Sequence, residues 1–220
     1  MNNSITDLFK DYDILSLGYN CNFKYFFTKI LGQSTETHFF DYIGSSMWAI
    51  VKLFETDFED LLNPEYYKNI KIIHNICYFY LTHTKYYLRF IHDLRHIKEF
   101  PIFKDKYERR KNRLYEKLTN NQQLLLFRFE EPMINRVEHS EYSLYFKTTE
   151  LEYLGQLITL MKNKFNINNI KIIFFSNSES TGYYNNIIVI NINQYNHIVC
   201  KKTHIATIIN EHYDFIKNLL

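Results

Sequence analysis

Cys21 stands where a cysteine can act as a nucleophile, between a short apolar run that ends at Gly18 and the amphipathic segment that follows. The free N–H groups and the dipole at the start of a helix favour a thiolate and can hold an oxyanion. Cys21 is therefore a candidate nucleophile, and the N–H groups near Asn20 and Asn22 are candidates for stabilising negative charge on an attacked carbonyl. Because unpaired cysteines often fill space as small apolar residues, a structural role for Cys21 stays an alternative.

A cysteine nucleophile also needs a base, which is usually a histidine oriented by a carboxylate or an amide. The chain has nine histidines, and two of them are the preferred candidates. His92 adjoins Asp93 after an apolar, strand-like run, and His204 begins the expected last helix. The residues alone leave the choice between the two open.

The other cysteines and histidines carry weaker signals. Cys77 and Cys200 lie within or beside apolar runs, so we expect both to be structural. Three widely separated cysteines form neither a disulfide framework nor a paired zinc site, which favours a reducing compartment. His92 and His96 have the i, i+4 spacing of some metal sites but lack the glutamate of His-Glu-x-x-His and a third ligand. The sequence therefore predicts neither a metal nor another cofactor.

Basic residues gather on one expected helix and on the strand that follows it. Arginine suits phosphate and carboxylate groups, so Arg109, Arg110 and Arg128 are candidate ligands of an anionic substrate. Interleaved acidic residues favour a solvated, ion-paired face for most of that helix instead. Arg128 stands between two phenylalanines and needs a partner if it is buried, for which Glu130 or Glu131 is the expected carboxylate.

The elements that would position these residues follow from hydrophobic periodicity. Expected strands cover residues 13–18, 124–129, 170–175 and 187–192, with a hairpin or two short strands between 70 and 94. Expected helices cover residues 21–31, 45–54, 104–118, 148–165 and 204–219. This alternation predicts one α/β domain over residues 1–220, a three-layer sandwich with a mostly parallel central sheet flanked by helices. Ligands in such folds bind beyond the carboxyl ends of the strands, which is where the turn containing Cys21 would lie.

Length and charge limit the function further. The chain has 220 residues, and its basic residues exceed its acidic residues by only two, so no strong field would draw it onto nucleic acid or an anionic membrane. It shows neither a signal-peptide pattern nor an apolar run approaching the ~20 residues that span a bilayer. We expect a cytoplasmic protein with a small-molecule or peptide substrate; the sequence leaves its oligomeric state open. The excess of aromatic, Asn, Ile and Lys residues is typical of an AT-rich genome.

Several short blocks resemble a family of papain-like cysteine peptidases. The run from Ser16 to Cys21 resembles that family's opening motif, Ser-Leu-Gly-x-x-Cys. Phe40-Asp41-Tyr42-Ile43 resembles the family's Phe-Asp-Trp-Ile motif, and Phe90-Ile91-His92-Asp93 resembles its Phe-x-His-Asp motif. The family's Arg-Arg helix and the strand after it are matched by Tyr107-Glu108-Arg109-Arg110 and Leu126-Phe127-Arg128. The resemblance implies that Cys21 is the nucleophile and His92 its base, with Asp41 or Asp93 orienting the imidazole.

The chain departs from papain in two respects. No glutamine stands a few residues before Cys21 to build the usual oxyanion hole, and the alternating elements suit a three-layer sandwich rather than a helical lobe against a barrel. The layout is also similar to that of lipase-like Ser-Gly-Asn-His hydrolases, with cysteine in place of serine. That fold-level analogy favours His204 as the base and an ester as the substrate.

Three classes of function therefore remain. The first is a cysteine-dependent hydrolase or acyl transferase that uses Cys21. The second is a transferase or binding protein for a phosphorylated or nucleotide-sugar ligand, held by arginines at the carboxyl edge of the sheet. The third is a protein-interaction module without catalytic activity.

Overall fold

The computed structural model describes residues 4–220 except 19–21, 34–35, 75, 91–99, 121–122, 131–147 and 196–203, and gives only the backbone of residues 68–82. Several residues singled out from the sequence lie outside this description. They are Asn20, Cys21, His92, Asp93, His96, Glu131 and Cys200, together with the side chain of Cys77.

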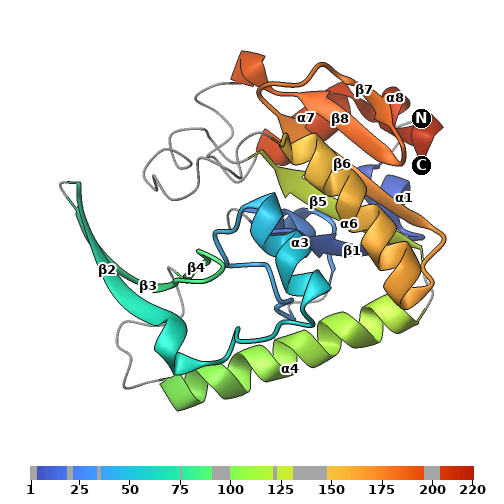
Figure 1. The fold of residues 1–220 in the computed structure, drawn as a ribbon. Helices are drawn as coiled ribbons and strands as arrows, with labels where there is room; N and C mark the ends of the chain where they lie inside the picture. The colour runs from blue at the N-terminus through green and yellow to red at the C-terminus, as the bar shows by residue number, and fades with distance from the viewer. Residues whose placement is uncertain are drawn as a thin grey trace.

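Four parallel strands form the central sheet and lie side by side in chain order (Figure 1). They are β1 (Asp13–Ser16), β5 (Leu124–Phe129), β6 (Ile170–Ser176) and β8 (Ile187–Asn191). The short β7 (Gly182–Tyr184) pairs antiparallel with β8, so β7 and β1 are the two edges of the sheet. Strands covered on both faces need apolar residues throughout, which explains their continuous apolar runs.

Helices cover both faces of this sheet. The β1–β5 and β5–β6 crossovers each move one position in the same direction, and such crossovers are right-handed, so their longer helices gather on one face. These are α3 (Met47–Glu55), α4 (Phe100–Thr119) and α6 (Glu150–Phe165). The opposite face is covered by α1 (Ile5–Phe9), α2 (Asn22–Tyr25), the π-helix η1 (Phe26–Ile30), α7 (His204–Glu211) and α8 (Tyr213–Leu219). The predicted three-layer α/β sandwich is confirmed.

Local signals in the sequence explain where several helices begin. Ser46 caps α3 by accepting a hydrogen bond from Ala49 N–H at 3.2 Å, and Thr149 and Glu152 form a capping box at the start of α6. The expected helix over 204–219 is wrong in one respect, because the chain leaves helical geometry at His212 and forms α7 and α8. The short elements α1 and β7 were not predicted.

A second, antiparallel sheet contains β2 (Tyr67–His74), β3 (Ile76–His83) and β4 (Arg89–Phe90), which confirms the expected hairpin. The short 3-10 helix η2 (Pro64–Tyr66) precedes it, and another, η6 (Asn193–Tyr195), follows β8. The β2–β3 hairpin extends away from the central sheet (Figure 1). Strand β4 returns to the body of the protein, where Arg89 pairs with Gly44 through two backbone hydrogen bonds of 2.8 and 2.9 Å.

A tight turn follows β1. Gly18 adopts a φ of +81°, and its N–H donates to Ser16 Oγ at 3.0 Å. A Cβ atom at Gly18 would lie 2.5 Å from Ser45 Oγ and 2.9 Å from the Ile43 carbonyl oxygen. Glycine is therefore required here both by conformation and by space.

Replacing Gly18 with alanine should lower the free energy of unfolding by about 2 kcal/mol or more, because a left-handed non-glycine residue costs about 1–2 kcal/mol before any clash. Urea denaturation measures this loss. Gly155→Ala is the matched control, since Gly155 lies inside α6 with nothing within 4 Å of an added Cβ, and should gain about 0.5–1 kcal/mol. Similar losses in both variants would contradict the packing described for Gly18.

A buried histidine anchors the turn between β3 and β4. His83 is 0% exposed; its Nε2 lies 3.0 Å from the Asp60 carbonyl oxygen and its Nδ1 accepts from Tyr86 N–H at 3.2 Å. Burial lowers the pKa of His83 to about 4, so the folded protein holds the neutral ring. The unfolded chain takes up a proton near pH 6.5, and the stability linked to this ring is fully present above that pH.

The free energy of unfolding should therefore fall as pH decreases from about 6.5 to about 4, with His83 contributing about 2–3 kcal/mol of that loss. Urea denaturation at pH 7 and pH 4.5 should show a smaller difference for His83→Gln than for the wild type. An unchanged difference would mean that His83 does not titrate in this way.

Candidate functional site

The turn predicted to hold Cys21 lies between two described elements. Strand β1 ends at Ser16, and α2 begins at Asn22, the residue directly after Cys21. The helix continues into η1, and its apolar side chains pack against the sheet, with the Phe23 ring 4.4 Å from the Phe129 ring. The roles proposed for Asn20, Cys21 and Asn22 stay predictions, although the strand-to-helix connection expected around them is present.

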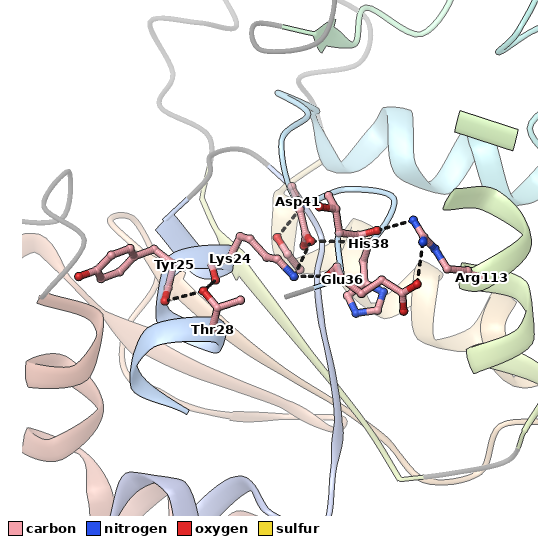
Figure 2. Close-up of polar contacts among 10 residues, drawn as sticks. Lys24, Tyr25, Thr28, Glu36, His38, Asp41 and Arg113 are labelled. Carbon is pink, nitrogen blue, oxygen red and sulfur yellow. Dashed lines mark hydrogen bonds and ion pairs between the residues drawn. The ribbon is translucent and has the colours of Figure 1, made fainter. Parts of the chain in front are cut away.

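A buried lysine follows one turn later in the same helix. Lys24 is 6% exposed, and its Nζ donates to the Glu36 carbonyl oxygen and lies 3.6 Å from Asp41 Oδ2 (Figure 2). A lysine buried to this degree normally needs an acidic partner. The pair therefore joins α2 to the segment that contains Asp41.

Asp41 is the most unusual carboxylate among the described residues. It is 0% exposed, and its Oδ2 accepts from His38 N–H at 2.7 Å. Its Oδ1 is buried and has no hydrogen-bond partner within the described part of the chain. Burial raises the pKa of Asp41, whereas the His38 N–H and the nearby Lys24 and Arg110 charges oppose that shift. A buried acceptor without a donor costs about 1–3 kcal/mol, so such an atom calls for an explanation.

The segment leading to His92 and Asp93 begins beside this region. Arg89 of β4 pairs with Gly44, and the buried Phe90 ring lies 5.1 Å from the ring of Tyr107 in α4. Phe90 is the last described residue before His92, and it therefore lies close to the segment around Asp41. His92 and Asp93 themselves stay predictions.

Arg128 is fully buried and bound on both sides. Its Nε and one terminal nitrogen donate to the two carboxylate oxygens of Glu150 at 3.2 and 2.8 Å, and the other terminal nitrogen donates to the Leu17 carbonyl oxygen at 3.1 Å. The expected partner was Glu130 or Glu131; the carboxylate that the structure shows is Glu150, and Glu131 lies outside the described residues. Glu130 instead accepts hydrogen bonds from the turn at residues 176–178, because that turn follows β6 beside the end of β5.

The two neighbouring arginines of α4 differ in position. Arg109 is exposed, whereas Arg110 is buried and donates to the Tyr107 hydroxyl at 3.0 Å. Arg110 also lies near enough to Asp41 to lower the pKa of that carboxyl. An anion-binding role for Arg109, Arg110 and Arg128 stays a prediction.

His204, the second candidate base, is the first residue of α7 and is partly buried. Helix α7 contacts η1, the continuation of the helix that follows Cys21. His204 therefore lies on the same side of the sheet as that helix and remains a candidate.

Two polar residues of this region were missed in the sequence. Lys24 had a detectable signal, since it stands three residues after Cys21 in a segment that is otherwise largely apolar. His38 had none, because its position beside Asp41 depends on the folding of an irregular segment.

Within the described ranges, no three His, Cys, Asp or Glu side chains are grouped so that they could hold a metal ion. Among the described helices, none has the length and apolarity needed to cross a bilayer.

Comparison with known proteins identifies one family. A family model described as "Putative papain-like cysteine peptidase" matches residues 12–151. No curated protein and no solved structure matches the chain. The match covers well over half of the 220 residues and confirms the family resemblance predicted from the sequence. The protein therefore belongs to this papain-like cysteine peptidase family.

Proposed function

We propose that this protein is a cysteine-dependent hydrolase or acyl transferase in which Cys21 attacks a carbonyl carbon. The observation that carries the proposal is the fully buried Asp41 with one oxygen lacking a donor among the described residues. A carboxylate of this kind is suited to orient an imidazole and to stabilise the imidazolium that forms during catalysis.

Asp41 is linked to the chain on both sides of Cys21. Before Cys21, Gly18 packs against the carbonyl groups of Phe40 and Ile43, which flank Asp41. After Cys21, Lys24 forms the ion pair with Asp41. These two contacts place Asp41 beside both of the described segments that flank Cys21 in the sequence, which supports the proposal.

His92 is the preferred base in this proposal. It follows Phe90 by two residues, and β4 is held against Gly44, three residues after Asp41. An N–H of the imidazole would supply the donor that Asp41 Oδ1 lacks and would remove the cost of that buried acceptor. Asp93 is the alternative orienting residue, and His204 is the alternative base.

The proposed reaction has two stages. The Cys21 thiolate attacks the carbonyl carbon of an amide or ester, and N–H groups near Asn20 and Asn22 stabilise the oxyanion. The intermediate collapses when the C–N or C–O bond breaks, the imidazolium gives its proton to the leaving amine or alcohol, and a thioester remains. Water that has lost a proton to the imidazole then attacks the thioester, which releases the acid and regenerates the thiolate. An amine or alcohol in place of water gives acyl transfer.

Cys21 should react with iodoacetamide much faster than Cys77 or Cys200, with a thiolate pKa well below the ~8.5 of a free cysteine. Peptide mapping by mass spectrometry after timed labelling measures the three rates separately. Cys21→Ser should remove the fast phase and leave the other two rates unchanged. Slow and similar labelling at all three cysteines would exclude this mechanism.

Asp41→Asn should raise the pKa of the Cys21 thiol by about one unit, because the amide keeps the shape of the carboxylate but cannot stabilise an imidazolium paired with a thiolate. The pH dependence of the iodoacetamide rate gives this pKa, and circular dichroism checks that the variant is folded. Asp57→Asn is the control, since Asp57 is exposed and its partners are Lys164 and Tyr115. An unchanged thiol pKa in Asp41→Asn would remove Asp41 from the mechanism while leaving Cys21 as the nucleophile.

A further inference from the structure

The irregular segment that leads into Asp41 is held between two helices (Figure 2). From α4, Arg113 donates to Glu36 Oε1 at 2.6 Å and to the Thr37 carbonyl oxygen at 2.9 Å. From α2, Lys24 Nζ donates to the Glu36 carbonyl oxygen and forms the ion pair with Asp41. The segment is therefore anchored on both sides before the chain reaches Asp41.

The two oxygens of the Asp41 carboxylate have different surroundings. Oδ2 accepts from His38 N–H at 2.7 Å and lies 3.6 Å from Lys24 Nζ. Oδ1 is buried and has no hydrogen-bond partner among the residues that the structure describes. Because the N–H and the ammonium group both lie at Oδ2, Oδ1 is the oxygen left to accept from a further donor.

The charge on Asp41 depends on the groups packed against it, because the side chain is 0% exposed. Burial has the largest effect and raises its pKa, whereas the His38 N–H, the Lys24 ammonium group and the Arg110 charge lower it. The pKa of the His38 ring is itself lowered to about 4, chiefly by burial, so this ring is neutral at pH 7. An opposite charge nearby typically lowers the pKa of a carboxyl by about 1–3 pH units. Loss of Lys24 would therefore favour the protonated acid, which is a poor orienting acceptor for an imidazole N–H.

We infer that Lys24 is a positioning residue of the proposed cysteine site, whose ammonium group holds Asp41 as a carboxylate and leaves Oδ1 to accept from the base. Its effect on Cys21 rests on the proposed function, whereas its effect on Asp41 does not. A lysine with a purely structural role would stabilise the fold without changing the pKa of the Cys21 thiol.

NMR of protein labelled with ¹³C at the aspartate carboxyl carbons measures the Asp41 pKa directly, with the resonance assigned by its loss in Asp41→Asn. Lys24→Met should raise this pKa by about 1–3 pH units, and Lys24→Arg, which keeps the charge, should restore most of the difference. Lys85→Met is the matched control, since Lys85 pairs with Asp60 at 2.7 Å, and should leave Asp41 unchanged. The same Asp41 pKa in Lys24→Met and the wild type would overturn the inference.

A double-mutant cycle tests the link to Cys21 through the pH dependence of its reaction with iodoacetamide. Lys24→Met should raise the thiol pKa by up to the value expected for Asp41→Asn, about one pH unit. The double variant should match Asp41→Asn alone, because Lys24 acts through Asp41. Additive effects would show that Lys24 acts on the thiol directly and would overturn the inference.

The cycle also separates failure of this inference from failure of the proposed function. If Asp41→Asn changes the thiol pKa and Lys24→Met does not, the inference fails and the proposed function stands. If Lys24→Met shifts the Asp41 pKa while all four proteins have the same thiol pKa, the role of Asp41 in the cysteine mechanism fails, and the inference fails with it.

Loss of stability in Lys24→Met provides a further test. The folded-state pKa of Asp41 in this variant should lie above the ~3.9 of an unfolded chain, so its stability relative to the wild type should fall as pH rises. Urea denaturation at pH 5 and pH 8 measures this change, and an equal loss at both pH values would contradict the inference. The double variant removes both buried charges and should be more stable than Lys24→Met at pH 8. If Lys24→Met does not fold, a thiol pKa that differs between the double variant and Asp41→Asn still overturns the inference.

Discussion

The buried guanidinium of Arg128 fixes the carboxyl end of β1, on which the candidate site depends. One of its nitrogens binds the Leu17 carbonyl oxygen beyond the last paired residue of an edge strand, and two others bind Glu150 at the start of α6. Both members of the Arg128–Glu150 pair are buried, and removing one member of such a pair typically costs about 3–5 kcal/mol. This arrangement joins two strands and a helix at one point, so the backbone entering the Gly18 turn has little freedom to move.

The Lys24–Asp41 pair and its surroundings form a second region where polar groups are buried together. Buried ion pairs often add little net stability relative to apolar residues of the same size, so stability alone gives a weak reason for this pair. Asp41 keeps one oxygen without a donor, and His38 keeps one nitrogen without a partner, among the residues that the structure describes. Buried polar atoms that lack hydrogen-bond partners are rare in purely structural regions. Their presence here favours a region that contacts another side chain or a ligand.

The sequence predicted the layers of the fold because each depends on local patterns. Continuous apolar runs identified the parallel strands, and helical periodicity over residues 148–165 identified α6. The partner of Arg128 was not predictable, because Glu150 lies 22 residues away and reaches it only once α6 packs across the sheet. For the candidate site, Asp41 was selected only through the family resemblance, and its pairing with Lys24 depends on the path of the irregular segment between them.

Because the β1–β5 and β5–β6 crossovers move in the same direction, their longer helices all lie on one face of the sheet and shorter helices cover the other. The helix after Cys21 lies on that face, and its apolar underside rests on aromatic rings from several strands, including Phe129 and Phe175. Helices α7 and α8 cover the remainder. The family match ends at residue 151, yet β6, α7 and α8 all come later in the chain. A fragment trimmed to the matched residues would lack β6, α7 and α8 and would expose apolar side chains of α2 and η1, so this layer of the core needs residues beyond the match.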